Sequence, residues 1–206
     1  YVSPTFAGLN ATVAYVANEN KAMEGMTAAN TTGFDAGLKY ADGPIMAAVT
    51  YNAVITNDAT DLKISDLRVG GSYNFGTASV RAVFDLARAD KLGGEKFTQA
   101  VYGLGATLDL TPASKLLGQV YVARDLKQDG SSQDDSGAKL FELGFQHSLS
   151  KRTMLKATYA MIKNDSNASY DFGVNAAGVN PGSMPAGFSA AGGSVQGISF
   201  GVRHTF

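Results

Sequence analysis

The 206-residue chain contains no cysteine and no tryptophan, and it has only two histidines. Without cysteine, disulfide frameworks and thiol chemistry are excluded. The formal net charge is -1, so no basic excess is present to hold a nucleic-acid backbone. No apolar run approaches the roughly 18 residues of a membrane helix. With a mean hydropathy of -0.04, the chain has the hydropathy of an ordinary soluble protein.

The first residues also lack several features. The stretch "YVSPTFAGLN" has no methionine, no basic start and no apolar segment of the kind found in a signal peptide. We therefore expect either a mature form or a chain whose beginning is missing.

What the sequence does contain is alternation with a period of two. Phe34, Leu38 and Tyr40 alternate with Asp35 and Lys39, and most other segments repeat this pattern of one apolar and one polar face. Such alternation hides a membrane signal, because lipid-facing and lumen-facing residues cancel in any hydropathy average. The pattern predicts ten strands, near 8–17, 32–41, 44–53, 66–75, 78–88, 97–110, 114–124, 138–149, 153–162 and 195–206.

Short and long connections alternate between these strands. The short ones are "ADGP", "FGTAS", "TPAS" and "SLSKRT"; they lean basic, with Lys115, Lys151 and Arg152 against Asp42. The long ones are expected at about 17–32, 53–66, 88–96, 124–137 and 162–194. Tight turns at one end and long loops at the other are typical of an outer-membrane barrel.

One strand register follows from a turn. If Gly76 and Thr77 form a two-residue turn, Phe75 faces Ala78, and apolar residues meet apolar residues on one face. On the other face, Ser72 then meets Arg81, and Arg68 meets Asp85. A slip by one residue would mix the two faces.

A soluble β-sandwich is the alternative fold class. Its strands average about 5–6 residues, whereas several segments here reach ten or more, which suits a tilted bilayer crossing. The final "GISFGVRHTF" ends on an aromatic residue inside a strand, which suits a face in lipid. The sequence therefore favours an all-β fold, a transmembrane antiparallel β-barrel.

Three stretches resemble the general, non-specific porins of Gram-negative bacterial outer membranes. They are "YVSPTFAGL" (1–9), "FELGFQHSLSKRT" (141–153) and "GISFGVRHTF" (197–206), of which the last two are the more specific. The resemblance implies a sixteen-stranded barrel of which this chain supplies the C-terminal part, strands 7–16. Residues 1–206 would then form a single, N-terminally incomplete porin domain that lacks six strands and the constriction loop.

The resemblance also implies function and partners. We expect a water-filled channel for passive diffusion of ions and small hydrophilic solutes, without a cofactor. Expected partners are the lipid bilayer and lipopolysaccharide, two further copies in a homotrimer, and the outer-membrane assembly machinery, but no nucleic acid. The assembly signal would lie in the last strand, in Phe200, Val202, His204 and Phe206.

The charged residues on the polar faces are the candidate pore lining. They are Asp35, Lys39, Arg68, Arg81, Asp85, Asp109, Glu142, Lys156 and Arg203. Both signs of charge, together with many glycines on the same face, suit an aqueous channel. Arg81 is the strongest candidate, since the register gives Arg68 an acidic partner and gives Arg81 only Ser72, with Gly103 or Gly105 allowed on its other side.

Two other classes remain: a ten-stranded outer-membrane enzyme and a structural or adhesive barrel. An enzyme would need a polar cluster at the extracellular rim, but His147 and His204 lie on apolar faces near the opposite end. The stretch "DGSSQDDSG" (129–137) lacks the ligand spacing of a calcium loop and reads as a solvated loop. We expect no catalytic, cofactor or metal site.

Overall fold

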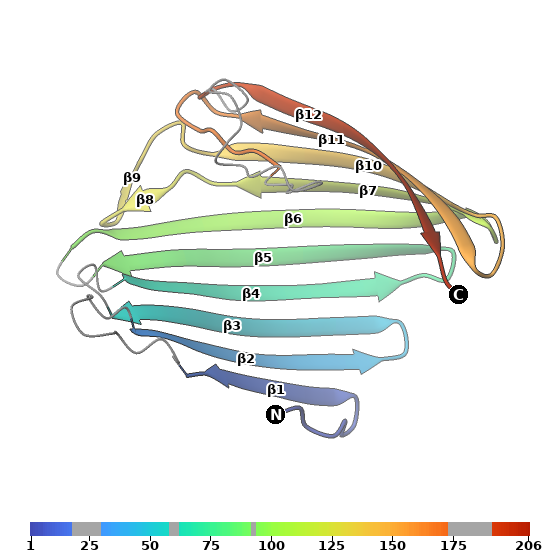
Figure 1. Cartoon of the computed structure of the whole chain (residues 1–206), viewed down its shortest axis with the longest axis horizontal. Helices are drawn as coiled ribbons and strands as arrows, with labels where there is room; N and C mark the ends of the chain where they lie inside the picture. The colour runs from blue at the N-terminus through green and yellow to red at the C-terminus, as the bar shows by residue number, and fades with distance from the viewer. Residues whose placement is uncertain (18–29, 58–61, 92–93, 173–190) are drawn as a thin grey trace. The chain divides into compact units, whose positions relative to one another are not determined.

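The computed structural model describes residues 1–17, 30–57, 62–91, 94–172 and 191–206 (Figure 1). All regular elements in these ranges are β-strands. No helix within them has the length and hydropathy required to span a membrane.

Most strands are long and follow one another in sequence. Their bounds are β1 (Leu9–Val16), β2 (Asn30–Asp42), β3 (Ile45–Asn57), β4 (Leu62–Asn74), β5 (Ala78–Lys91), β6 (Lys96–Thr111), β7 (Ser114–Ala123), β8 (Lys127–Gln128), β9 (Ser131–Ser132), β10 (Ala138–Ser148), β11 (Thr153–Asn164) and β12 (Ser194–His204). Hydrogen-bonded neighbours follow the order β1-β2-β3-β4-β5-β6-β7-β10-β11-β12, with β8 pairing with β6 and β9. The pairings of β1-β2-β3-β4, of β7-β10-β11-β12 and of β8 with β6 and β9 are antiparallel, as predicted.

The ten predicted strands are confirmed as the ten long ones. Two strand ends were predicted wrongly, because β3 continues to Asn57 and β4 begins at Leu62, so much of the expected loop at 53–66 is strand. The reason is visible in the residues: Val54, Ile55 and Ile64 are β-branched and continue the strand beyond the predicted bounds. The short β8 and β9 lie within the expected long loop at 124–137.

Two compact units make up the described chain. Unit 1 contains Tyr1–Asn74, Arg81–Tyr102 and Leu126–Gln133; unit 2 contains Phe75–Val80, Gly103–Asp125 and Asp134–Phe206. Strands β5 and β6 therefore contribute residues to both units. Each unit is a set of antiparallel strands.

The start of unit 1 is a tight hairpin. Phe6 and Leu9 exchange backbone hydrogen bonds of 2.8 Å across Ala7 and Gly8, which have φ values of 46° and 81°. A Cβ at Gly8 would lie 2.7 Å from the carbonyl oxygen of Ala41, so this turn requires glycine both for its dihedral and for its close approach to β2. Positive φ at both central residues is the geometry of the tight hairpin turns that match strand twist.

Neither unit is built around a packed core. The buried apolar residues are Ala53, Ala138, Ile162 and Ala168, and among the described residues no large side chain is fully buried. Large apolar side chains are instead exposed along one face of the strands, for example Leu38, Val49 and Val69, which lie in one row across β2, β3 and β4. The apolar side of the sheet thus needs an apolar surrounding.

Candidate functional site

The polar residues of unit 1 lie on one face of the sheet. Antiparallel partners share a face, and Asp35 on β2 is the partner of Asn52, which is the partner of Asp66 on β4. Lys39 lies four residues after Asp35 and therefore on the same face. We call this surface the charged face of unit 1, and the opposite surface its apolar face.

Arg68 is the centre of a small charge cluster on this face. Its Nε donates to Asp85 Oδ2 at 2.6 Å, and its terminal nitrogen lies 2.5 Å from the same oxygen. Asp66 lies on the same strand as Arg68, and its Oδ1 is 3.9 Å from a terminal nitrogen of the arginine. The positive charge of Arg68 is therefore balanced at short range by two carboxylates.

The contact between Arg68 and Asp85 tests the predicted register of β4 and β5. The Phe75 nitrogen donates to the Ala78 oxygen at 2.7 Å, as a two-residue turn at Gly76 and Thr77 requires. A Cβ on Gly70 would lie 3.7 Å from the Cβ of Val83, which places these residues opposite each other. The predicted register is confirmed.

Arg81 differs from Arg68 in having no such partner. It is exposed, and it forms no hydrogen bond or ion pair with any residue that the structure describes. It lies four residues before Asp85 on β5 and hence on the same charged face. The structure thus separates a neutralised arginine from an uncompensated one, as the sequence predicted.

Unit 2 has an equivalent charged face. Glu142 on β10 is the partner of Gln119 on β7 and accepts a hydrogen bond of 2.6 Å from its Nε2. Four residues further along, Gln146 is the partner of both Lys115 and Lys156. The pairing resolves β7, whose alternation was ambiguous in the sequence: Leu117 lies on the charged face, opposite Gly144.

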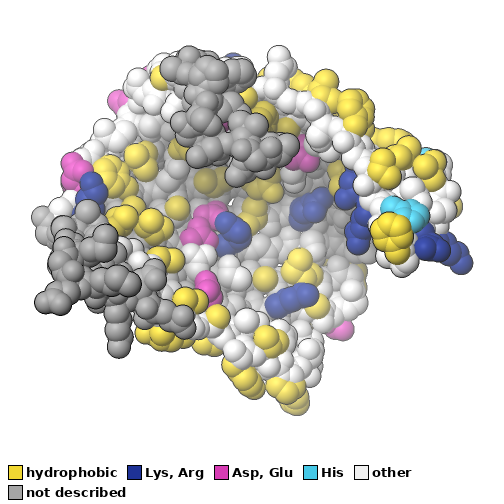
Figure 2. All heavy atoms as spheres, in the orientation of Figure 1, with side chains coloured by type: hydrophobic (Ala, Val, Ile, Leu, Met, Phe, Trp, Pro, Cys, Tyr) yellow, Lys and Arg dark blue, Asp and Glu magenta, His cyan; other side chains and the backbone are white. Residues whose placement is uncertain are grey.

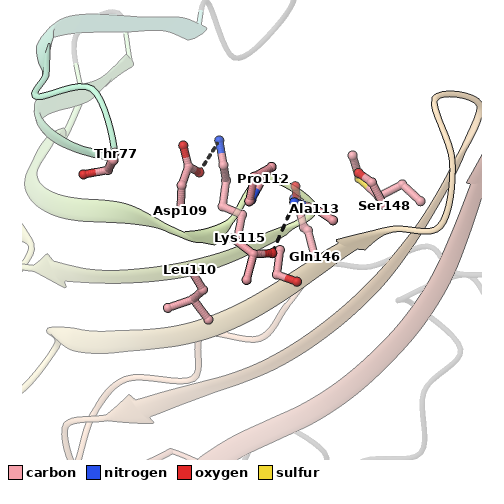
Figure 3. A pocket seen from close by; sticks show the side chains of 11 residues that line it. Thr77, Asp109, Leu110, Pro112, Ala113, Lys115, Gln146 and Ser148 are labelled. Atoms are coloured by element: carbon pink, nitrogen blue, oxygen red, sulfur yellow. Dashed lines mark hydrogen bonds and ion pairs between the residues drawn. The ribbon is translucent and has the colours of Figure 1, made fainter.

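The charged face of unit 2 ends in a cavity beside the tight turns. Its volume is about 600 Å³, and its lining includes Asp109, Lys115, Gln146, Ser148 and Met154. Figure 3 shows the side chains of Asp109 and Lys115 pointing toward one another, with 3.1 Å between the lysine nitrogen and a carboxylate oxygen. Asp109, a predicted site residue, is therefore paired, whereas Lys156 and Arg203 are exposed.

Sequence reasoning missed two charged members of these faces. Asp66 escaped notice at the edge of a predicted strand, although its spacing of two from Arg68 places both on one face. Lys115 was counted among the turn residues but lies within β7. Its spacing of four from Gln119 would have assigned it to the polar face.

In Figure 2, basic, acidic and apolar side chains appear together on the face turned to the viewer.

Both histidines are held at the turn end by a hydroxyl group. His147 Nδ1 lies 2.9 Å from Ser114 Oγ, and His204 Nδ1 lies 2.9 Å from Thr153 Oγ1. Each imidazole also contacts a phenylalanine two residues away on its own chain segment. Both rings thus lie beside aromatic residues near strand ends, the position of the aromatic girdles in a transmembrane barrel.

Two carboxylates between β7 and β10 accept hydrogen bonds from backbone nitrogens, one within this segment and one on β6. Asp125 Oδ1 accepts from the nitrogens of Ser136 and Gly137 at 3.1 Å each, and Asp129 Oδ1 accepts from the Lys96 nitrogen at 3.0 Å. Within the described ranges, no three His, Cys, Asp or Glu residues are grouped as metal ligands.

Comparison with known proteins agrees with long strands that have one apolar and one charged face. Residues 1–168 match the family model described as Gram-negative porin. The chain belongs to this family. Outer membrane porin protein 32 of Delftia acidovorans is 30% identical over 211 residues, which cover 100% of this chain and 55% of the relative. An outer membrane porin of Bordetella pertussis is 25% identical over 200 residues, covering 80% of this chain and 51% of the relative.

A solved structure gives the same result. The anion-selective porin from Comamonas acidovorans superposes with a TM-score of 0.80 at 25% identity, covering 100% of this chain and 58% of that one. The porin chain described here thus spans about half the length of the curated relatives it matches. It is an outer-membrane protein whose antiparallel strands form the wall of a transmembrane β-barrel. The numbering of its strands as 7–16 stays a prediction.

The Arg68 cluster gives a first prediction for this porin wall. Asp85→Asn removes from Arg68 the carboxylate that accepts its hydrogen bond, while Asp66 stays at 3.9 Å, so we expect stronger anion preference in the complete gene product. The double variant Arg68→Gln/Asp85→Asn removes both charges at once and should leave selectivity nearly unchanged. Zero-current potentials in a potassium chloride gradient measure both effects, and equal shifts in the two variants would contradict the idea.

Proposed function

We propose that the whole protein forms a water-filled channel for passive diffusion of ions and small hydrophilic solutes. One observation carries this proposal: each unit exposes an apolar face on one side of its strands and a charged, glycine-containing face on the other. An apolar face suits lipid, and a polar face suits an aqueous lumen. In this proposal the charged faces line the lumen, including the nine predicted residues.

Several side chains on the charged faces are small, which supports an open lumen. Gly37, Gly70, Gly144 and Gly201 occupy positions in register with the charged residues, where a sealed barrel would need larger side chains to fill its interior. The name of the Comamonas acidovorans protein describes it as anion-selective. We extend anion preference to this chain because Arg81, Lys156 and Arg203 have no acidic partner among the described residues.

The proposal includes a homotrimeric assembly. It includes no catalytic step. His147 and His204 lie at strand ends against hydroxyl groups, and neither ring pairs with a carboxylate of the described residues. The role of Phe200, Val202, His204 and Phe206 as an assembly signal stays a prediction, as do lipopolysaccharide contacts and the single-domain organisation.

Reconstitution of the complete gene product tests the channel. Planar bilayers should show discrete conductance steps, and proteoliposomes should swell in small sugars at rates that fall with solute size. A folded trimer that is silent in both assays would overturn the proposal and favour a structural or adhesive barrel.

A further inference from the structure

Three basic side chains gather at the turn end of the charged face of unit 2. Lys115 on β7 is the register partner of Gln146, which is the partner of Lys156 on β11. Arg203 on β12 is the partner of Met154, two residues before Lys156 and on the same face. Since neighbouring strands lie about 4.8 Å apart, the Cα atoms of Lys115 and Lys156 are about 10 Å apart.

This cluster has too few carboxylates to be neutral. Asp109 pairs with Lys115, but Lys156 and Arg203 form no hydrogen bond or ion pair with the described residues. On β10, the strand between Lys115 and Lys156, the next acid on this face is Glu142, four residues from Gln146 and thus about 14 Å along the strand. That distance exceeds the screening length of about 8 Å at physiological ionic strength. Three cations therefore face one carboxylate.

Uncompensated cations on adjacent strands repel each other. Like charges in close cross-strand positions destabilise a sheet, and diagonal neighbours such as Lys156 and Arg203 remain within reach of each other. A bound anion would remove this repulsion.

The side chains around the cluster are suited to an oxyanion. The guanidinium of Arg203 offers paired N–H donors, and the ammonium of Lys156 offers a compact charge. Gln146, Ser148 and Met154, the register partner of Arg203, line the cavity of about 600 Å³ beside the tight turns, whose lining does not include Lys156 or Arg203.

We propose that Lys156 and Arg203, with Gln146 between Lys156 and Lys115, form a binding site for a small, doubly charged oxyanion. Two unpaired cations match two negative charges better than one, so the site should prefer such ions to chloride. Concentrating them at one mouth of the channel is a role that rests on the proposed function. The binding itself does not depend on it.

Calorimetric titration with sodium sulfate tests the site. The complete gene product, folded in detergent micelles at physiological ionic strength, should bind sulfate, and Lys156→Gln/Arg203→Gln should weaken that binding about tenfold. Lys39→Gln is the matched control, because Lys39 is an exposed lysine on the charged face of unit 1 with the uncharged partners Asn10 and Ala48. Its sulfate affinity should change by less than about twofold.

The exchange variant Lys156→Arg/Arg203→Lys keeps both charges and should retain sulfate binding. If the double Gln variant fails to fold, as judged by gel mobility with and without heating, Lys156→Gln alone should still lower the affinity. Unchanged sulfate affinity in the folded Gln variants, or an equal loss in Lys39→Gln, would overturn the site. Sulfate binding by a protein without conductance would overturn the channel and leave the site intact.

Discussion

Arg81→Glu should shift the complete gene product toward cation preference by a large factor. Arg81 is exposed on the charged face and has no hydrogen-bonding or ion-pair partner among the described residues. A fixed charge beside a narrow aqueous path attracts counter-ions and repels co-ions. Reversing its sign therefore changes the energy of every passing ion.

The size of this effect follows from Coulomb's law. Two unit charges about 8 Å apart in water interact by about 0.5 kcal/mol. Reversal of the charge thus changes the energy of each ion by about 1 kcal/mol, which is about a fivefold change in local concentration, in opposite directions for anions and cations. Low-dielectric walls strengthen the interaction, and salt weakens it.

The control for Arg81→Glu is the charge-neutral double variant Arg68→Gln/Asp85→Asn. It alters an arginine on the same face but leaves the net charge unchanged, so the zero-current potential should move little. At 1 M salt the screening length falls to about 3 Å, and the effect of Arg81→Glu should shrink accordingly. Unchanged selectivity of Arg81→Glu at low salt, in a protein that still forms trimers, would show that Arg81 does not control the ion path.

Leu143→Lys should have the largest effect on stability. Leu143 is 55% exposed at the middle of β10, on the apolar face between Gly118 and Tyr159. A lysine at the bilayer midplane of a barrel costs about 2–4 kcal/mol. We expect a lower free energy of unfolding in lipid vesicles by this amount and reduced levels of folded protein in the outer membrane.

Glu142→Lys is the matched control for Leu143→Lys. Glu142 is the preceding residue on β10 and faces the other side, where it accepts from Gln119. The same new side chain there should lower the free energy of unfolding by less than Leu143→Lys does, since it faces the polar side and only one side-chain hydrogen bond is lost. Equal destabilisation by both lysines would mean that the two faces of β10 do not differ in their surroundings.

The alternation of side chains was enough to predict the long strands and one register. A two-residue turn at Gly76 and Thr77 places apolar residues opposite one another on one face. On the other face it places Arg68 opposite Asp85, and the structure contains that contact. This succeeded because a shift by one residue exchanges the two faces of a strand, so the burial pattern permits a single register.

The partners of single charges were harder to predict. Lys115 pairs with Asp109 across a tight turn, and the composition of that turn suggested that Lys115 was itself a turn residue. The alternation around Leu117 did not show which face of β7 is polar. Strand ends were also missed near Asn57 and Leu62, because polar residues occur both in turns and on water-facing strand positions. The alternation of apolar and polar residues cannot distinguish a turn from a water-facing strand position where both faces of the strand lie near water.

The lack of a packed apolar core among the described residues affects how the molecule folds. Among the described residues, the buried apolar side chains are three alanines and Ile162, so intramolecular burial supplies little driving force. In water, folding would expose the apolar rows rather than hide them, while the conformational entropy lost would be the same. Chain collapse and entry into the bilayer should therefore be one coupled event, and the newly made chain must be kept from aggregating until lipid is reached.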